Sequence, residues 1–255
     1  NAKSPPAISF RSVSPRSPVK NRVTLVKIGF GIDVGGTGIK GAPVDLIAGH
    51  LIADRFRIPT PKPATPTAVA VVVGQIIAHF PQASEVDQIG VAIPAVVRRG
   101  VAMSAANIDK SWIDTDVDAL FTDLLDREVH VVNDADAAGV AEYAHGAAHG
   151  QRGLVCAITL GTGIGSALIH DGVLIPNSEF GHLEVDGHPD AEKWCAASVH
   201  ENQGLSWHEW ASRLQSYFTQ LERLISPDLF VVGGGISKQA DEFLPLLNLR
   251  TPIVA

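Results

Sequence analysis

Three glycine-rich turns, each placed directly after a run of apolar residues, constrain this 255-residue chain more than any other feature. They read GIDVGGTGIKGA at 31–42, LGTGIGSAL at 160–168 and VVGGGIS at 231–237. An apolar, β-branched run that ends at glycines is typical of a buried strand followed by a tight turn. One such turn is ordinary, but three in one chain indicate an α/β protein whose strand ends carry a function.

The spacing of apolar residues between these turns predicts helices and strands in alternation. We expect helices over 65–80 and 114–125, and strands over 88–94 and 128–134. The order of strand, glycine turn and strand at the start of the chain recurs at 153–174. This repetition predicts two related α/β domains that face a cleft.

The composition of the first residues differs from that of the rest. Residues 1–22 are rich in Ser and Pro, carry five basic side chains and contain no acid. Because such a segment cannot build an apolar core, we expect a basic tail at 1–22. A smaller N-terminal domain at 23–134 and a larger C-terminal domain at 135–255 then follow.

Charge and cysteine content exclude several classes of protein. The net charge of −7 argues against nonspecific binding of nucleic acid. Two cysteines are too few for a disulfide scaffold or a four-thiolate zinc site, which favours a reducing compartment. No apolar run reaches the roughly 18–20 residues of a membrane helix. We therefore expect a cytoplasmic protein without a nucleic-acid or membrane partner, and the oligomeric state stays open.

The first glycine turn has the chemistry of a phosphate site. Backbone amides exposed by glycines form a concave anion site, to which a hydroxyl adds a donor and a lysine adds a charge. The spacing of a Walker loop is absent, and the GxGxxG match at 36–41 precedes an expected strand rather than the helix of a dinucleotide site. The candidate phosphate ligands are Gly35, Gly36, Thr37, Gly38 and Lys40.

Polar residues between the glycine turns are suited to binding sugar hydroxyls. Amides and carboxylates at strand ends can bond several hydroxyls and reject substrates that lack one. Two of them have a structural alternative, because Asp134 can cap the helix expected after it and His182 can be a structural histidine. The candidates are Asn107, Asn133, Asp134, Glu179 and His182.

The motifs DVGGT, NDADAAG, LGTGIGSA and EFGH occur in an order that resembles the ROK sugar kinases of the actin and hexokinase superfamily. The resemblance covers about residues 26–255, and GGTGIKGA, SAANIDKSW and GHLEVDGH are most similar to the polyphosphate glucokinase branch, which includes glucomannokinases. It implies two actin/hexokinase-like, RNase H-like domains that flank a cleft. It also implies transfer of a terminal phosphoryl group from inorganic polyphosphate or ATP to the 6-hydroxyl of glucose, and also of mannose.

The resemblance assigns roles to individual residues. Asp134 would be the general base, and Asp33 would position Mg²⁺ through water. Glu192 would join Asn107, Asn133, Glu179 and His182 on the sugar, with Glu184 as the alternative to Glu192. The phosphates would be held by Thr37, Thr162, Gly163 and Gly165, and Gly234 and Gly235 would face the adenosine or further phosphates.

Two departures from the family carry expectations of their own. Many relatives have a zinc-binding cysteine cluster after the Gly-His turn, whereas LEVDGHPDAEKWCAAS here contains one cysteine, so no zinc is expected. Relatives usually show Pro-Gly after the fourth strand, where this chain has Pro94 and Ala95. The methyl group of Ala95 stands where the backbone can approach the sugar.

Two other functions remain open. A nicotinamide-dependent oxidoreductase would need the glycine turn in VVGGGISKQADEFL to open a helix on a dinucleotide. A non-catalytic, sugar-binding ROK-type regulator would need a helix-turn-helix domain, which residues 1–22 are too short and too rich in Ser and Pro to form.

Overall fold

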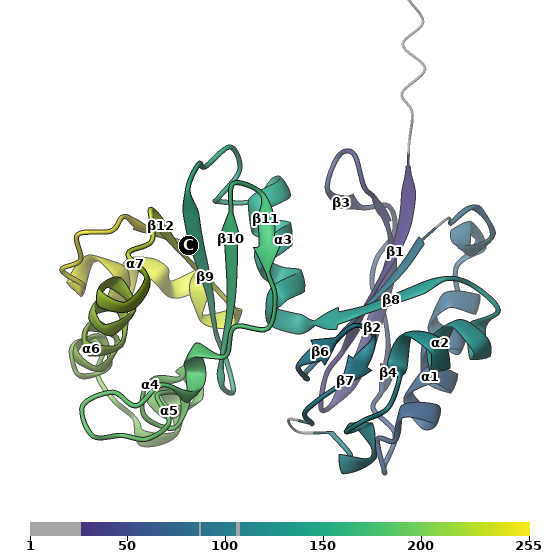
Figure 1. The fold of residues 1–255 in the computed structure, drawn as a ribbon, viewed down its shortest axis with the longest axis horizontal. Coiled ribbons are helices and arrows are strands. Elements are labelled where there is room, and N and C mark those ends of the chain that lie inside the picture. The colour runs from purple at the N-terminus through teal and green to yellow at the C-terminus, as the bar shows by residue number, and fades with distance from the viewer. Residues whose placement is uncertain (1–26, 87, 106–107) are drawn as a thin grey trace, which may run out of the picture.

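The computed structural model describes residues 27–86, 88–105 and 108–255, and it contains two main β-sheets (Figure 1). The first sheet has the order β3-β2-β1-β5-β8, with β4 paired to β2. Its strands are β1 (Ile28–Val34), β2 (Gly38–Asp45), β3 (His50–Leu51), β4 (Phe56–Pro59), β5 (Gln88–Ile93) and β8 (Val129–Asn133). Because β1, β5 and β8 are parallel, their carboxyl ends lie at one edge of the sheet.

Two helices cover one face of the first sheet (Figure 1). They are α1 (Pro66–Ala78) and α2 (Val117–Leu125), and they confirm the helices predicted over 65–80 and 114–125. Each begins at a side-chain cap: Thr65 accepts a hydrogen bond from Ala68 N, and Asp116 accepts one from Ala119 N. A hairpin of β6 (Val97–Arg98) and β7 (Val101–Ala102) extends from the end of β5.

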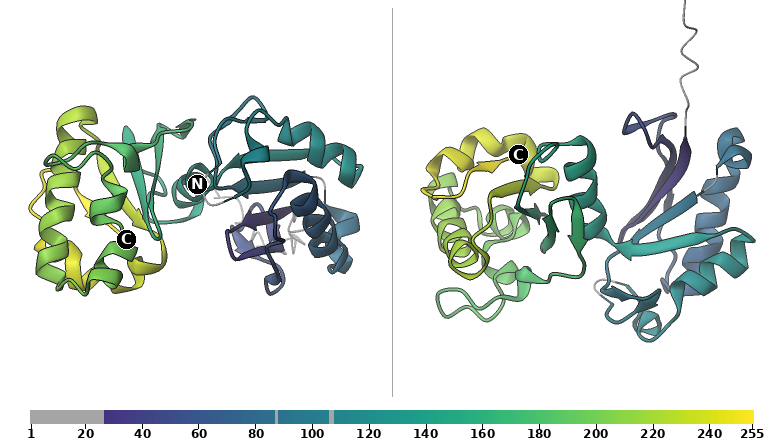
Figure 2. Two further views of the ribbon diagram at one scale, coloured as in Figure 1. Left: turned by 90° about the horizontal axis from the view of Figure 1, so that it is seen from below. Right: turned by 45° about the horizontal axis from the view of Figure 1, so that its top comes forward.

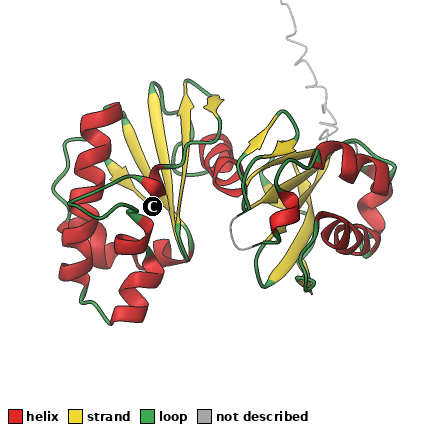
Figure 3. Ribbon diagram, turned by 60° about the horizontal axis from the view of Figure 1, so that its bottom comes forward, coloured by secondary structure: helices red, strands yellow, loops and turns green. Residues whose placement is uncertain are grey.

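The second sheet has the order β11-β10-β9-β12-β13 and lies between two layers of helices (Figure 3). One face contacts α3 (Asp134–His145), and the other is covered mainly by α6 (Trp207–Ile225), which starts in a capping box between Ser206 and Glu209. The strands are β9 (Leu154–Leu160), β10 (Ile164–His170), β11 (Val173–Ile175), β12 (Leu229–Gly233) and β13 (Ile253–Val254).

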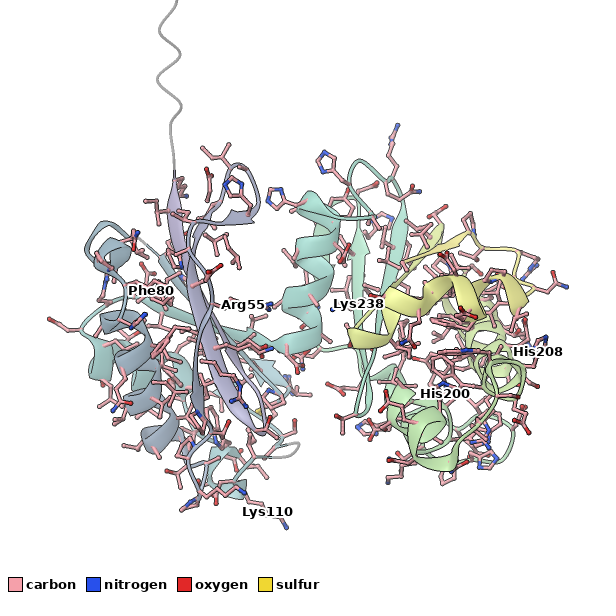
Figure 4. The ribbon with its side chains drawn as sticks, turned by 180° about the vertical axis from the view of Figure 1, so that it is seen from behind. Arg55, Phe80, Lys110, His200, His208 and Lys238 are labelled. Carbon is pink, nitrogen blue, oxygen red and sulfur yellow. The ribbon has the colours of Figure 1, made fainter. Side chains whose placement is uncertain are left out.

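Short helices complete the second half. His200 of α5 stacks on Trp207 and Trp210, with ring centroids 4.3 and 5.0 Å apart, which fixes α5 on α6 (Figure 4). These helices are α4 (Glu192–Cys195), α5 (Ala197–Gln203) and α7 (Ala240–Phe243). The 3-10 helices of the chain are η1 (Pro81–Glu85), η2 (Lys110–Trp112), η3 (Phe180–His182), η4 (Gly235–Gln239) and η5 (Leu244–Leu246).

The chain crosses from the first half to the second where β8 ends and α3 begins (Figures 1 and 2). Among the described residues, the apolar cluster of the first sheet draws on residues between 28 and 131, and those of the second sheet on residues between 143 and 253. Two separate cores support our proposal of domains at 23–134 and 135–255. In the described parts of the chain, no helix combines the length and apolar character needed to cross a membrane.

Candidate functional site

A cavity of about 720 Å³ lies between the two halves, within the size range of small-molecule sites. The first half contributes the carboxyl ends of β1, β5 and β8, and the second half contributes the β9–β10 turn, the segment around η3 and the start of α4. Its lining includes predicted site residues from every motif that the structure describes: Gly35, Gly36, Asn133, Asp134, Thr162, Gly163, Gly165, Glu179, His182, Glu192 and Gly234. Asn107 lies outside the described residues.

Asp134 is the first residue of α3 and opens onto this cavity. Its Oδ1 accepts a hydrogen bond from Ala135 N at 2.8 Å. Desolvation by the surrounding protein raises the pKa of the carboxyl, the Ala135 amide lowers it, and the negative charge of Asp33 raises it further. A carboxylate with a raised pKa at the edge of a cavity is suited to accept a proton.

Asn133 provides the helix cap that the sequence also allowed for Asp134. Its Oδ1 accepts hydrogen bonds from Ala135 N at 2.9 Å and Asp136 N at 3.1 Å, while its Nδ2 donates to Ala95 O at 3.1 Å. The amide nitrogen has a second N–H, which can donate to a hydroxyl in the cavity. Asn133 therefore fixes the start of α3, and with it Asp134.

Asp33 and Lys40 face each other on β1 and β2, where they are register partners. The Lys40 Nζ lies 2.9 Å from the Asp33 Oδ2, and neither residue lines the cavity. The lysine predicted to bind phosphate thus neutralises the aspartate predicted to position Mg²⁺.

The donor set near Asp134 fits Mg²⁺ bound together with a phosphate substrate. The described residues contain no group of three His, Cys, Asp or Glu side chains that could hold a metal ion. Mg²⁺ commonly takes one or two carboxylates and completes its shell with substrate phosphates and water. The carboxylate of Asp33, which is close enough to Asp134 to raise its pKa, can supply one such carboxylate.

Strand β4 and Thr60, the residue after it, fix the first glycine turn. The Thr60 Oγ1 donates to Gly35 O at 2.5 Å, and the Arg57 Nη2 donates to Thr37 O at 2.8 Å. Gly38 admits this arginine, because a Cβ there would lie 2.3 Å from its Nε. Thr37 and Gly38 do not line the cavity, and they belong to the support of the turn. Arg57 and Thr60 could not be predicted from the sequence, since a lone cation and a lone hydroxyl at a strand end carry no signal.

The glycines of the second turn allow other residues to approach. A Cβ on Gly163 would lie 2.4 Å from the Glu192 Oε2, and a Cβ on Gly165 would lie 2.7 Å from the Ala135 Cβ. Both glycines line the cavity and also admit a neighbouring side chain. Thr162 lies between Gly161 and Gly163 in the same turn. Its carbonyl accepts a hydrogen bond from the Ser198 Oγ at 2.7 Å.

The third turn separates two cavities. Gly234 lines the main cavity, whereas Gly235 lines a smaller one of about 270 Å³ that shares Leu160, Gly161 and Thr162 with it. After this turn the chain forms only η4, five residues long, and α7, four residues long. Neither is the long helix whose N-terminus holds the pyrophosphate in a dinucleotide site.

Two carboxylates and a histidine of the second half meet at the main cavity: Glu179, Glu192 and His182. Burial raises the pKa of Glu179, the charge of His182 lowers it, and nearby acids including Asp134 raise it. Glu184, the alternative to Glu192, is exposed and does not line the cavity. The geometry therefore favours Glu192 over Glu184 as the additional acid that the family resemblance assigns to the sugar.

Replacing each of the two glutamates by glutamine in a separate variant tests this assignment. For the sugar substrate that the family resemblance implies, Glu192→Gln should raise the KM by about ten- to a hundredfold, the loss expected for a hydrogen bond to a charged group. Glu184→Gln should leave the KM within about twofold of the wild type, because its side chain lies outside the cavity. Steady-state kinetics with varied sugar measure both, and the opposite ranking would assign the role to Glu184.

Asp190 contacts the Nδ1 of His182 and orients its ring. The Asp190 Oδ1 lies 3.2 Å from the His182 Nδ1, and its Oδ2 lies 2.5 Å from the Lys193 Nζ. The Lys193 ammonium and, after it, His182 lower the pKa of Asp190, so that it stays ionised. A carboxylate beside Nδ1 accepts a hydrogen bond from the proton on that nitrogen and so fixes the orientation of the ring, whose Nε2 lies 3.9 Å from the Glu179 Oε2.

Asp190→Asn should therefore raise the KM for sugar by about three- to tenfold and change kcat much less, since a charged partner of the histidine is lost. Lys193→Gln serves as the matched control, because it removes the partner of Asp190 but not the bond to His182. If Asp190→Asn and Lys193→Gln have the same small effect, the carboxylate does not orient the ring.

Comparison with known proteins yields consistent similarities. The model of the ROK family matches residues 29–201. The chain is 48% identical to the polyphosphate glucokinase of Mycobacterium tuberculosis over 95% of its own length and 91% of that protein. The crystal structure of the inorganic polyphosphate/ATP-glucomannokinase from Arthrobacter sp. strain KM is 56% identical, with a TM-score of 0.82 over 89% of this chain and 91% of that one. A ROK family glucokinase from Streptomyces griseus in complex with glucose and AMPPNP shares the fold at 24% identity, with a TM-score of 0.73 over 89% and 94% of the two chains.

Proposed function

This chain belongs to the ROK family, and we propose that it is a hexose kinase that transfers the terminal phosphoryl group of inorganic polyphosphate or ATP to the 6-hydroxyl of glucose, and also of mannose. One observation carries the proposal. The carboxyl of Asp134 opens onto a cavity that has glycine turns on both halves and a cluster of acids and a histidine beside them. Such a site offers a proton acceptor, anion-binding amides and hydroxyl-binding groups together.

Asp134 acts as the general base in this proposal. Its carboxylate accepts the proton of the 6-hydroxyl while that oxygen bonds to the terminal phosphorus, and the bond from phosphorus to the rest of the donor breaks. The amides of Gly163 and Gly165 and the hydroxyl of Thr162 stabilise the charge on the transferred group. Asp33 would position Mg²⁺ bound with the donor, and the ion would supply positive charge against the phosphates.

The sugar is held by groups that can bond to several of its hydroxyls. Glu179, Glu192 and His182 approach from the second half, and the free N–H of Asn133 approaches from the end of β8. Because the carboxylates accept and the amide donates, a sugar that lacks one hydroxyl leaves one of these groups unpaired. This arrangement supports selection of hexoses over water as the acceptor.

The donor is proposed to extend from the main cavity into the smaller one past Leu160, Gly161 and Thr162. Figure 4 labels Arg55 of the first half and Lys238 of η4, two exposed cations that line neither cavity. We propose polyphosphate as a donor alongside ATP because the relatives at 48% and 56% identity are named for the use of polyphosphate.

The two other functions considered from the sequence are not favoured. A nicotinamide-dependent oxidoreductase would need a long helix after Gly234, and the structure has short helices there. A non-catalytic regulator would not need a carboxyl poised as Asp134 is, and the relatives compared above at 48% and 56% identity are named as kinases.

The function is tested by incubating the purified chain with glucose or mannose, with polyphosphate or ATP, and with or without Mg²⁺. Hexose 6-phosphate should form with both donors when Mg²⁺ is present and should cease when EDTA removes it. Product with ATP alone would remove polyphosphate from the proposal. If neither donor yields product although glucose binds in calorimetry, the kinase proposal is wrong.

A further inference from the structure

One side chain forms hydrogen bonds across the two halves. Asn177 lies in the loop between β11 and η3 of the second half, whereas Val97 begins β6 of the first half. The Asn177 Oδ1 accepts from Val97 N at 2.9 Å, and its Nδ2 donates to Val97 O at 2.8 Å. The amide thus pairs with the Val97 backbone as a neighbouring strand would, on the side of the first half where β6 and β7 lie in Figure 1.

The backbone around Asn177 is fixed from the second half. Asn177 has a φ of 62°, a left-handed conformation that asparagine tolerates better than most residues. Its N–H donates to the Asp136 Oδ2 at 2.8 Å, and Asp136 is buried in the first turn of α3. The next residue, Ser178, exchanges two hydrogen bonds with Ser166 of β10, at 2.7 and 2.9 Å. The backbone at Asn177 is therefore held by hydrogen bonds to α3 and, through Ser178, to β10.

Both ends of this connection reach the main cavity. Glu179 follows Asn177 by two residues, and Ala95 and Val96 directly precede Val97. All three line the cavity. The bonds of Asn177 thus set the separation between the sugar-side walls that the two halves contribute.

We infer that Asn177 is a positioning residue for the sugar: it holds the Ala95–Val96 wall against Glu179 before the sugar binds. This inference rests on the proposed function. A site whose walls are already at the right separation does not lose free energy in ordering them when the sugar binds. Without the two bonds, that ordering accompanies binding and raises the KM for sugar, whereas the donor turns are not affected.

The test is Asn177→Gly, which permits the left-handed backbone and removes both bonds across the halves. The KM for glucose should rise about tenfold, the effect expected from two hydrogen bonds of ordinary strength. The KM for polyphosphate should stay within about twofold of the wild type. Asn177→Asp should not restore the KM, because the Val97 carbonyl requires a donor and a carboxylate has none.

Asp171→Gly is the matched control. Asp171 also has a positive φ, of 47°, and its Oδ1 accepts a bond from Gly153 N at 2.8 Å, but both of these residues belong to the second half. It should lower the thermal stability without changing the KM for glucose. The inference is overturned if Asn177→Gly leaves the KM for glucose unchanged, or raises the KM values for glucose and polyphosphate together. An inactive wild-type chain would instead contradict the proposed function.

Discussion

Asp134→Asn should lower kcat by about 10²- to 10⁴-fold, the usual contribution of a positioned general base, and should leave glucose binding measurable. The amide has nearly the same shape as the carboxyl and can still accept the hydrogen bond from Ala135 N, so the start of α3 is preserved. It cannot take the proton of the 6-hydroxyl. Initial rates of hexose 6-phosphate formation measure the loss, and calorimetric titration with glucose checks that the sugar still binds.

The pH dependence of the wild type provides a second readout of the same residue. Burial and the charge of Asp33 raise the pKa of Asp134, and a base works only when unprotonated. The rate should therefore fall as the pH drops through a value above the ordinary aspartate pKa of about 4. The pKa of Glu179 is raised as well, so Glu179→Gln is the control. If this acidic fall disappears in Glu179→Gln but persists in Asp134→Asn, Asp134 is not the base.

Gly234→Ala should lower the thermal stability sharply. Gly234 has φ 92° and ψ 175°, a region that is essentially restricted to glycine, and a Cβ there would lie 2.2 Å from Leu160 O. The strain and the overlap should together cost about 3 kcal/mol or more, which for a domain of this size lowers Tm by about 6–12 °C.

Gly235→Ala is the matched control for that measurement. A Cβ on Gly235 would meet no atom within 4 Å, and this glycine is not among those with a positive φ. Its Tm should stay within about 2 °C of the wild type, as expected for a substitution without strain. Equal Tm values for the two variants, measured by differential scanning calorimetry, would contradict the strain assigned to Gly234.

The elements that periodicity describes could be predicted from the sequence, as α1 and α2 show. Both have buried apolar residues at helical spacing and an oxygen-bearing cap, Thr65 or Asp116, in front of the first turn. The three glycine turns were also recognisable, because glycine after an apolar strand is a strong local signal. That residues of all three turns line one cavity could be expected only from the repetition of the turns and from the resemblance to a known family.

The bonds that connect distant parts of the site could not be predicted in this way. Asn177 and Val97 are 80 residues apart, and Arg57 lies 20 residues from the carbonyl that it binds. Nothing in the local pattern around either residue reports its partner, since these bonds arise from tertiary packing. For the same reason the sequence could not exclude Glu184 as the alternative to Glu192, although only Glu192 reaches the cavity in the described structure.

The passage from Asn133 to Asp134 has a consequence for how the two halves can move. When one body turns against another, each atom travels in proportion to its distance from the axis. The peptide that joins β8 to α3 links the two halves, and Asp134 is the first residue beyond it. Gly165 of the second glycine turn packs against Ala135 beside this peptide, so rotation about it would move the Asp134 carboxylate and this turn little, while the parts of each half that lie far from the peptide would move most.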